Sequence, residues 1–345
     1  MADCTVGLQL KNMPAPLVSI LIPAFNAERW IAETIQSALN QTWSRKEIIV
    51  VDDGSTDRTL NVAREFASSV VTIATQPNQG AAAARNKAYS ICQGDYIQWL
   101  DHDDLLAPDK ISMQIEAAAT SQSKRTLFSS AWGRFTYRPH RAVFEADGLW
   151  NDLTPREWLT RALQQGMYTQ PATWLISREL ASAAGPWDER LSFDDDGEYA
   201  CRLVAASDYV RFVPEAKLFY RRSGAGSLSR TRSDKQLHSE FLSMTLQVQH
   251  LLSVRDDSES RAAAASFLQR YLIDFYPERG DLVEQLRQFA KSFGCELDVP
   301  KMPAKYGWIQ MLFGWSAAKR AQLYYNEGKS LLLRSWDGAL LRLGV

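Results

Sequence analysis

Cysteine and long apolar runs are both scarce in this sequence, and each absence excludes a class of protein. The four cysteines lie far apart and form no C-x-x-C pair, so neither a zinc site nor a disulfide framework is indicated. No stretch of about 18 apolar residues runs without a charge, and residues 1–16 lack the basic-then-apolar pattern of a secretion signal. These absences predict a cytoplasmic protein.

An excess of one charge sign is also missing. The formal net charge of −1 offers no bulk attraction for polyanions, so we expect no nucleic-acid partner. What the chain does have is apolar material: 46% of its 345 residues are hydrophobic, enough to bury a large core in one large domain or two smaller ones.

Short β-branched runs alternate with amphipathic segments in the first third of the chain. Parallel strands joined by single helices need right-handed crossovers, so the alternation predicts an α/β, doubly wound, mostly parallel sheet with helices on both faces. Residues 127–220 are more mixed and are expected to form a second lobe on the same sheet. The expected strands lie in segments 17–26, 46–57, 70–75 and 95–110, and the expected helices between them are 28–41, 56–66 and 81–91.

Acidic residues follow two of these strands, where open α/β sheets bind ligands. In "LDHDD", residues 100–104, alternation along a strand end lets Asp101 and Asp103 face one side. Two carboxylates at this spacing suit Mg²⁺ or Mn²⁺ shared with a diphosphate. An Asp-rich turn that only caps the next helix is the competing interpretation.

The second acidic strand end is "VVDDGSTD", residues 50–57. Gly54 permits a turn closed to other residues, and the hydroxyl and acid after it suit a helix start. This leaves Asp52 and Asp53 to accept a base N–H or a ribose hydroxyl. Phosphohydrolases with an aspartyl nucleophile use D-x-D-G-[ST], but here the first acid of that pattern falls on Val51, so that interpretation fails.

A third cluster, "SFDDDGEYACRL", precedes a predicted helix at residues 198–206. Adjacent carboxylates repel one another, which raises the pKa of one of them toward that of a general base, whereas a helix N-terminus acts the other way. A capping role for Asp194 or Asp195 therefore remains open beside a catalytic one.

In combination the motifs resemble the inverting, metal-dependent family 2 glycosyltransferases, which have a GT-A fold. The matching segments are "VSILIPAFNAERWIAETIQSALNQTW", "EIIVVDDGSTD", "NQGAAAARNKAYSICQGDYIQWLDHDDLLAPDK", "GPWDERLSFDDDGEYACRL" and "FYRRSGAGSLSR", which together cover residues 17–230. The resemblance implies transfer of a sugar from a nucleotide diphosphate sugar, most often UDP-linked, to a hydroxyl of a glycan, a lipid-linked glycan or another acceptor.

The resemblance also assigns roles. Asp101 and Asp103 would hold Mn²⁺ or Mg²⁺, and Asp196 would be the base that deprotonates the acceptor. Asp195, where the family most often has Glu, and Trp174 would lie on the acceptor side, although core packing is the better interpretation for Trp174. The positions implied to bind the nucleotide sugar are Pro23, Phe25, Asn26, Asp52, Asp53, Gly80, Arg85, Asp101, Arg221 and Arg222.

Four segments are expected: an N-terminal extension (1–16), a nucleotide-sugar half (17–115), an acceptor half (116–232) and a C-terminal helical region (233–345). Residues 301–345 carry seven Lys or Arg against two acids, interleaved with aromatic side chains. They either contact the inner face of a membrane peripherally or pack on the catalytic domain or another subunit. Gly307, Gly314 and Gly328 are expected to break this stretch into short pieces, which favours packing.

Two other functions compete with this interpretation. A catalytically inactive sugar-nucleotide or glycan-binding module would keep the fold, but three intact acidic clusters favour an enzyme. A sugar-1-phosphate nucleotidyltransferase would need a Gly-rich phosphate loop after the first strand, and "PAFNAERW" has none. The sequence sets neither the sugar nor the oligomeric state.

Overall fold

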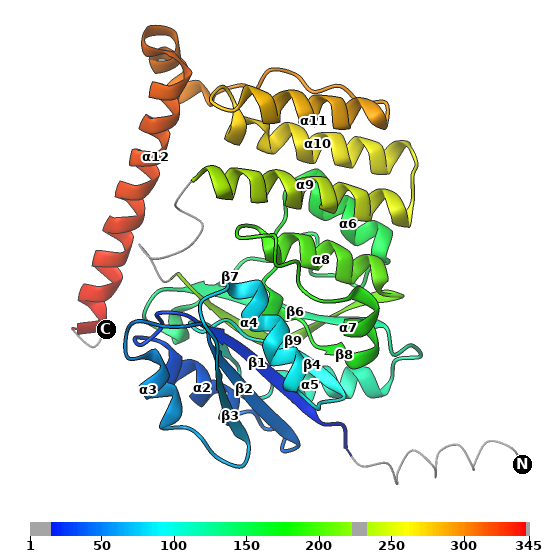
Figure 1. Cartoon of the computed structure of the whole chain (residues 1–345), viewed down its shortest axis with the longest axis vertical. Helices are drawn as coiled ribbons and strands as arrows, with labels where there is room; N and C mark the ends of the chain where they lie inside the picture. The colour runs from blue at the N-terminus through cyan, green and yellow to red at the C-terminus, as the bar shows by residue number, and fades with distance from the viewer. Residues whose placement is uncertain (1–14, 223–232, 343–345) are drawn as a thin grey trace, which may run out of the picture.

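The computed structural model describes residues 15–222 and 233–342 and shows a sheet domain capped by stacked helices (Figure 1). The predicted extension at 1–16 and the end of the "FYRRSGAGSLSR" motif lie largely outside the described residues. The sheet domain has two sheets, and the helices α9 (Asp234–Val254), α10 (Ser258–Phe275) and α11 (Gly280–Ser292) lie in successive layers away from it.

The first sheet confirms the predicted parallel arrangement. Its order is β3 (Val71–Thr75), β2 (Lys46–Asp52), β1 (Val18–Ala24), β4 (Tyr96–Trp99) and β8 (Ile176–Ser177). The first four strands are parallel, and β8 pairs with β4 in the antiparallel sense. All seven residues of β1 are buried, as a central strand covered on both faces requires. The connecting helices are α2 (Ile31–Leu39), α3 (Thr59–Arg64) and α4 (Ala81–Ile91).

The expectation that residues 127–220 extend the same sheet is wrong. They form most of a second sheet, in the order β5 (Leu105–Leu106), β9 (Tyr209–Arg221), β6 (Thr126–Phe135) and β7 (Val143–Phe144). The two long strands β6 and β9 pair with each other in parallel, and only the short β8 joins the first sheet. Since β5 belongs to the second sheet, the expected boundary near residue 115 does not separate the two sheets.

The helices between these strands link the sheets to the C-terminal layers. They are α5 (Lys110–Ala119), α6 (Pro155–Gln165), α7 (Arg178–Ala184) and α8 (Asp195–Ala206). One buried apolar cluster runs from β4 through α6 and α8 into α9, α10 and α11. The C-terminal helices therefore share a core with the domain that carries the acidic clusters.

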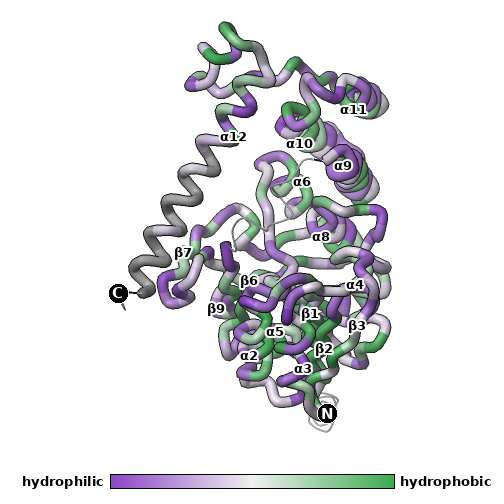
Figure 2. The backbone as a smooth tube through the Cα atoms, turned by 60° about the vertical axis from the view of Figure 1, so that its left-hand side comes forward, coloured by the Kyte–Doolittle hydropathy of each residue, from purple (hydrophilic) through white to green (hydrophobic). Residues whose placement is uncertain are grey.

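Helix α12 (Ala304–Arg342) confirms the expected break at Gly314 but not those at Gly307 and Gly328. Only Gly314 leaves helical geometry, with φ 81°, among the residues described in this element. A mid-helix glycine costs about 1 kcal/mol relative to alanine, too little to end a helix each time. Figures 1 and 2 show α12 as a separate column that starts beside α11 and runs back past the stacked helices. Within the described residues, no helix combines the length and the apolar character that spanning a membrane requires.

Candidate active site

The first two acidic clusters lie at the carboxyl ends of the two parallel strands that flank β1. β2 ends at Asp52, and β4 ends two residues before Asp101. Both strands pair with β1, so their ends reach the same edge of the sheet. The sequence prediction that the two clusters share one edge is confirmed.

Arg85 joins the D-x-D turn to the third acidic cluster. Its Nη2 donates to Oδ1 of Asp101 at 2.8 Å, and its Nη1 donates to Oδ2 of Asp195 at 2.7 Å. The guanidinium carbon lies 4.3 Å from the centroid of the Trp187 ring, and Arg85 is only 6% exposed. A cation buried between two carboxylates and an aromatic face is held in one orientation, so it fixes the separation of the two acids.

Helix α4 sets this arrangement. The residue after Arg85 is Asn86, whose side chain bonds both backbone groups of Trp187: its Oδ1 accepts from the N–H at 2.8 Å and its Nδ2 donates to the carbonyl at 2.9 Å. Trp187 also stacks on Tyr199 of α8, with ring centroids 3.9 Å apart. Adjacent residues of one helix thus supply the arginine, Arg85, and fix the ring beneath it through Asn86.

Asp196 lies next to Asp195 on the first turn of α8. One carboxylate oxygen accepts from its neighbouring Gly197 N–H at 2.9 Å, and the other accepts from the hydroxyl of Tyr168. Burial and the charge of Asp195 raise the pKa of Asp196 to about 6. That pKa lies closer to neutrality than that of an ordinary Asp, which suits a general base. Sequence reasoning missed Tyr168, a single loop residue that no spacing marks.

Asp53 has a structural task that the sequence did not reveal. Its carboxylate accepts from Nε2 of Gln76 at 2.8 Å and from the backbone N–H groups of Gln79 and Gly80 at 2.9 and 2.8 Å. It therefore ties the β2 end to the loop before α4. Asp52 is also buried, and its Oδ1 has no hydrogen-bond partner among the described residues. The predicted nucleotide contacts of both acids stay predictions.

Other predicted nucleotide residues line the same loops. Oδ1 of Asn26, whose φ is 48°, accepts from the Thr56 N–H at 2.9 Å and so joins the β1 loop to the β2 loop. Phe25 is 43% exposed, and Gly80 is exposed with φ 96°. Pro23 is buried in β1, and Arg222 is exposed after β9. Gly54 has φ 72°, as predicted for its turn.

The structure corrects two site predictions. Trp174 is fully buried in the core, so it presents no face to an acceptor. Arg221 is 2% exposed, and its guanidinium donates to the backbone oxygen of Asp103 at 2.8 Å and to Glu33 at 2.6 Å. It supports the D-x-D turn from behind, and contact with a diphosphate would require it to leave these partners.

The donor set at the turn fits a divalent cation shared with a phosphate ligand. Asp101 is bonded by Arg85 through one oxygen only, and the carboxylate of Asp103 accepts no hydrogen bond from a described residue. The described residues contain no group of three His, Cys, Asp or Glu side chains placed to hold a metal. Mg²⁺ is typically held by one or two carboxylates with water and phosphate completing the shell, and these two acids match that pattern.

Comparison with known proteins agrees with this geometry. Residues 19–182 match the family model described as Glycosyl transferase family 2. An uncharacterised glycosyltransferase of Rickettsia typhi is 35% identical over 199 residues, covering 57% of this chain and 61% of that protein. Chondroitin synthase of Escherichia coli is 43% identical over 103 residues, covering 29% of this chain and 15% of that protein. The chain spans less than two thirds of the length of these relatives.

A solved structure extends the comparison to the C-terminal helices. S. aureus TarS 1–349, in complex with UDP-GlcNAc, superposes with a TM-score of 0.64 at 16% identity and covers 80% of this chain and 81% of that chain. The sheet order, the acids at the strand ends and this likeness define the GT-A class of α/β fold. Residues 19–182 of the chain carry the sequence pattern of glycosyltransferase family 2.

Proposed function

We propose that this protein is an inverting glycosyltransferase that moves a sugar from a nucleotide diphosphate sugar to an acceptor hydroxyl in glycan or polysaccharide synthesis. The observation that carries the proposal is the Arg85 bridge, which joins Asp101 on the donor side to Asp195, the neighbour of the base. UDP is the expected nucleotide, in keeping with the UDP-GlcNAc in the TarS complex. The chondroitin synthase relative supports a glycan product.

On the donor side, the reaction leaves negative charge on the departing diphosphate. A divalent cation held by Asp101 and Asp103 would supply positive charge at that point. Arg85 keeps Asp101 oriented, and Arg221 holds the Asp103 backbone from behind. The nucleoside is expected against the loops that Asp53 and Asn26 tie together.

On the acceptor side, Asp196 takes the proton from the incoming hydroxyl. Its pKa of about 6 leaves it mostly ionised at neutral pH and still basic enough to share a proton in the transition state. The hydroxyl oxygen then attacks the anomeric carbon from the face opposite the leaving diphosphate. One displacement of this kind inverts the configuration and needs no covalent intermediate.

Asp196→Asn tests the role of the base. Transfer should fall by about 10²–10⁴-fold, while UDP affinity measured by calorimetry stays within about twofold. The conservative change keeps the side-chain size and the Tyr168 contact, so a folding defect is not expected. Wild-type turnover in this variant would remove Asp196 from the mechanism, and a wild-type protein that transfers nothing from any nucleotide sugar would favour the inactive binding module.

Asp103→Ala tests the cation. Mn²⁺ should strengthen UDP binding to the wild type and have little effect on the variant, because one of two ligands to the bridging ion is lost. Ser90→Ala, at an exposed position of α4, serves as a surface control. Equal Mn²⁺ dependence in wild type and Asp103→Ala would exclude this site.

We also propose cytoplasmic location with peripheral membrane contact through α12. The segment before Gly314 exposes four large apolar side chains, Trp308, Met311, Leu312 and Phe313, which are 59%, 84%, 67% and 68% exposed. The exposed Lys305 lies at the start of the same helix, and the exposed Lys301 lies three residues before it. Apolar residues beside basic ones suit an anionic membrane surface. The protein should co-sediment with vesicles that contain phosphatidylglycerol. The double variant Leu312→Glu with Phe313→Ser should abolish this co-sedimentation. Equal binding by that double variant would contradict the contact.

A further inference from the structure

One face of helix α9 holds the loop that precedes the catalytic helix. Ser239, Ser243 and Gln247 lie four residues apart, which places them on the same face, and all three are buried. The Ser239 hydroxyl accepts from the backbone N–H groups of Ser192 and Phe193, at 2.9 Å each, and donates to the Phe193 carbonyl at 2.8 Å. A single side chain thus satisfies three backbone groups that helix and sheet leave unpaired.

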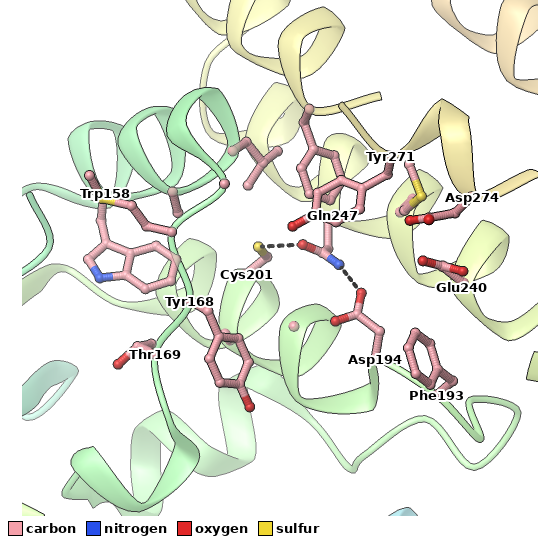
Figure 3. A pocket seen from close by; sticks show the side chains of 18 residues that line it. Trp158, Tyr168, Thr169, Phe193, Asp194, Cys201, Glu240, Gln247, Tyr271 and Asp274 are labelled. Carbon is pink, nitrogen blue, oxygen red and sulfur yellow. Dashed lines mark hydrogen bonds between the residues drawn. The ribbon is translucent and has the colours of Figure 1, made fainter. Parts of the chain in front are cut away.

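The next residue of the loop, Asp194, is held through its side chain as well. Its backbone is left-handed, with φ 57° and ψ 32°, a conformation that few residues other than Gly, Asn and Asp adopt. The Ser243 hydroxyl lies 2.8 Å from both the carbonyl oxygen and Oδ2 of Asp194. Nε2 of Gln247 donates to the same Oδ2 at 2.6 Å (Figure 3). These contacts hold the sharp turn from which α8 begins.

The Asp194 carboxylate also packs against the first turn of α8. A Cβ placed on Gly197 would lie 2.4 Å from Oδ1 of Asp194, so only glycine permits this approach. Asp195 and Asp196 lie between these two contact points. Their backbone is therefore fixed on both sides, by α9 before them and by the packed glycine after them.

We propose that the polar face of α9, formed by Ser239, Ser243 and Gln247, positions the general base Asp196 by fixing the backbone of residues 192–194. The inference rests on the proposed function and extends it to the C-terminal helical region. None of the three side chains touches the reacting atoms, so they are positioning residues. In this chain the helical region is then a working part of the active site, and removing α9 would disorder the base rather than only shorten the protein.

Hydrogen bonding, rather than negative charge, is what the turn requires of Asp194. Burial and the charge of Asp196 raise the pKa of Asp194 well above its ordinary value, so an ionised carboxylate is unfavourable there. Asparagine tolerates the left-handed backbone and offers an oxygen that accepts from both Ser243 and Gln247. The same substitution at two positions two residues apart, Asp194→Asn and Asp196→Asn, therefore distinguishes a positioning residue from the catalytic base.

The kinetic test uses substitutions along α9. Ser243→Ala and Gln247→Ala should lower kcat about tenfold or more, while the Kd for UDP stays within about twofold, because neither residue contacts the strand ends that hold the nucleotide. Ser253→Ala and Gln249→Ala change the same residue types at exposed positions of α9 and should leave kcat unchanged. Asp194→Asn should retain at least about a third of wild-type kcat, whereas Asp194→Ala should resemble Ser243→Ala.

Two outcomes would overturn the proposal. The first is wild-type kcat in Ser243→Ala and Gln247→Ala with only a lower melting temperature, which would make the face purely structural. The second is an Asp194→Asn variant as inactive as Asp196→Asn, which would show that Asp194 acts through its charge.

Amide hydrogen exchange tests the same inference without turnover. In Ser239→Ala, the amides of Ser192 and Phe193 should exchange at least about tenfold faster than in the wild type, because both lose their acceptor, while amides in α2 keep their rates. Unchanged exchange at these two amides would contradict the positioning role. If Asp196→Asn retains transfer while the exchange result holds, the proposed base is wrong and the loop contact stands.

Discussion

Two buried arginines flank the turn at residues 101–104, and they act on opposite sides of it. In front, Arg85 bonds the side chains of Asp101 and Asp195, both of which are partly exposed. Behind, Arg221 bonds the backbone oxygen of Asp103, and its own N–H donates to Oδ1 of the fully buried Asp104 at 2.8 Å. One arginine organises carboxylates for a ligand, and the other supports the backbone that carries them.

The aromatic partners show the same contrast. Arg85 lies over Trp187, which belongs to the loop leading to the catalytic helix. Arg221 is held between Trp30 and Phe135, with its guanidinium carbon 4.2 and 4.5 Å from the two ring centroids. Burial and the neighbouring Asp103 and Asp101 charges raise the pKa of Asp104 well above its ordinary value, so this acid belongs to the interior. Equal burial of two like residues therefore does not imply an equal role.

The largest effect is expected when Arg85 is replaced by lysine. A lysine ammonium cannot donate in a fork to two carboxylates, so Asp101 and Asp195 would lose their fixed separation. We expect kcat/KM to fall by about 100-fold or more, with a smaller change in melting temperature.

Arg178→Lys is the matched control for that change. Arg178 is also partly buried and lies over a ring, that of Tyr89, but it bonds backbone oxygens and not the catalytic acids. Its replacement should leave kcat/KM within about threefold. If both variants lost the same activity, the bridge would be no more than a general packing element.

The next effect is expected behind the turn. Arg221→Met removes the buried cation and leaves Glu33 and the Asp103 carbonyl without their donor. Breaking a buried pair costs about 3–5 kcal/mol, and since Glu33 is half-exposed we expect about 2–3 kcal/mol in the free energy of unfolding. Urea unfolding measures this, with the exposed neighbour Arg222→Met as control at under about 0.5 kcal/mol. An Arg221 variant that loses UDP binding but no stability would reverse the roles assigned to the two arginines.

The local pattern of the sequence predicts the first sheet but not the second. β1 and β2 are short β-branched runs with buried residues, and each is followed by its own helix, so topology rules apply directly. β6 and β9 are paired across more than seventy residues, and no pattern within either strand indicates which strand it pairs with. The pairing is decided by tertiary packing, which a single sequence does not display.

The site divides in the same way. Asp101, Asp195 and Asp196 stand in acidic clusters, and an aspartate cluster at a strand or helix end is visible in the sequence. Tyr168, the base's hydrogen-bond donor, and the serines of α9 are isolated polar residues in ordinary surroundings. They contact the catalytic loop only because α6, α8 and α9 pack around one core, so their roles could not be predicted from spacing.

The smallest expected effect is the acidic limb of the pH profile, which reports on the acceptor side of the Arg85 bridge. Asp196 accepts a proton only when ionised, and burial with the Asp195 charge raises its pKa to about 6. The active fraction should be about half at pH 6 and about a tenth at pH 5, so kcat/KM should fall below pH 6 rather than near pH 4, where an ordinary Asp titrates. The Tyr168 hydrogen bond stabilises the ionised form, so Tyr168→Phe should move the limb to higher pH. Initial rates at saturating Mn²⁺ measure the acidic limb in the wild type and in Tyr168→Phe. Thermal unfolding at each pH excludes loss of the fold. A limb near pH 4 in both proteins would show that Asp195 and burial do not tune the base.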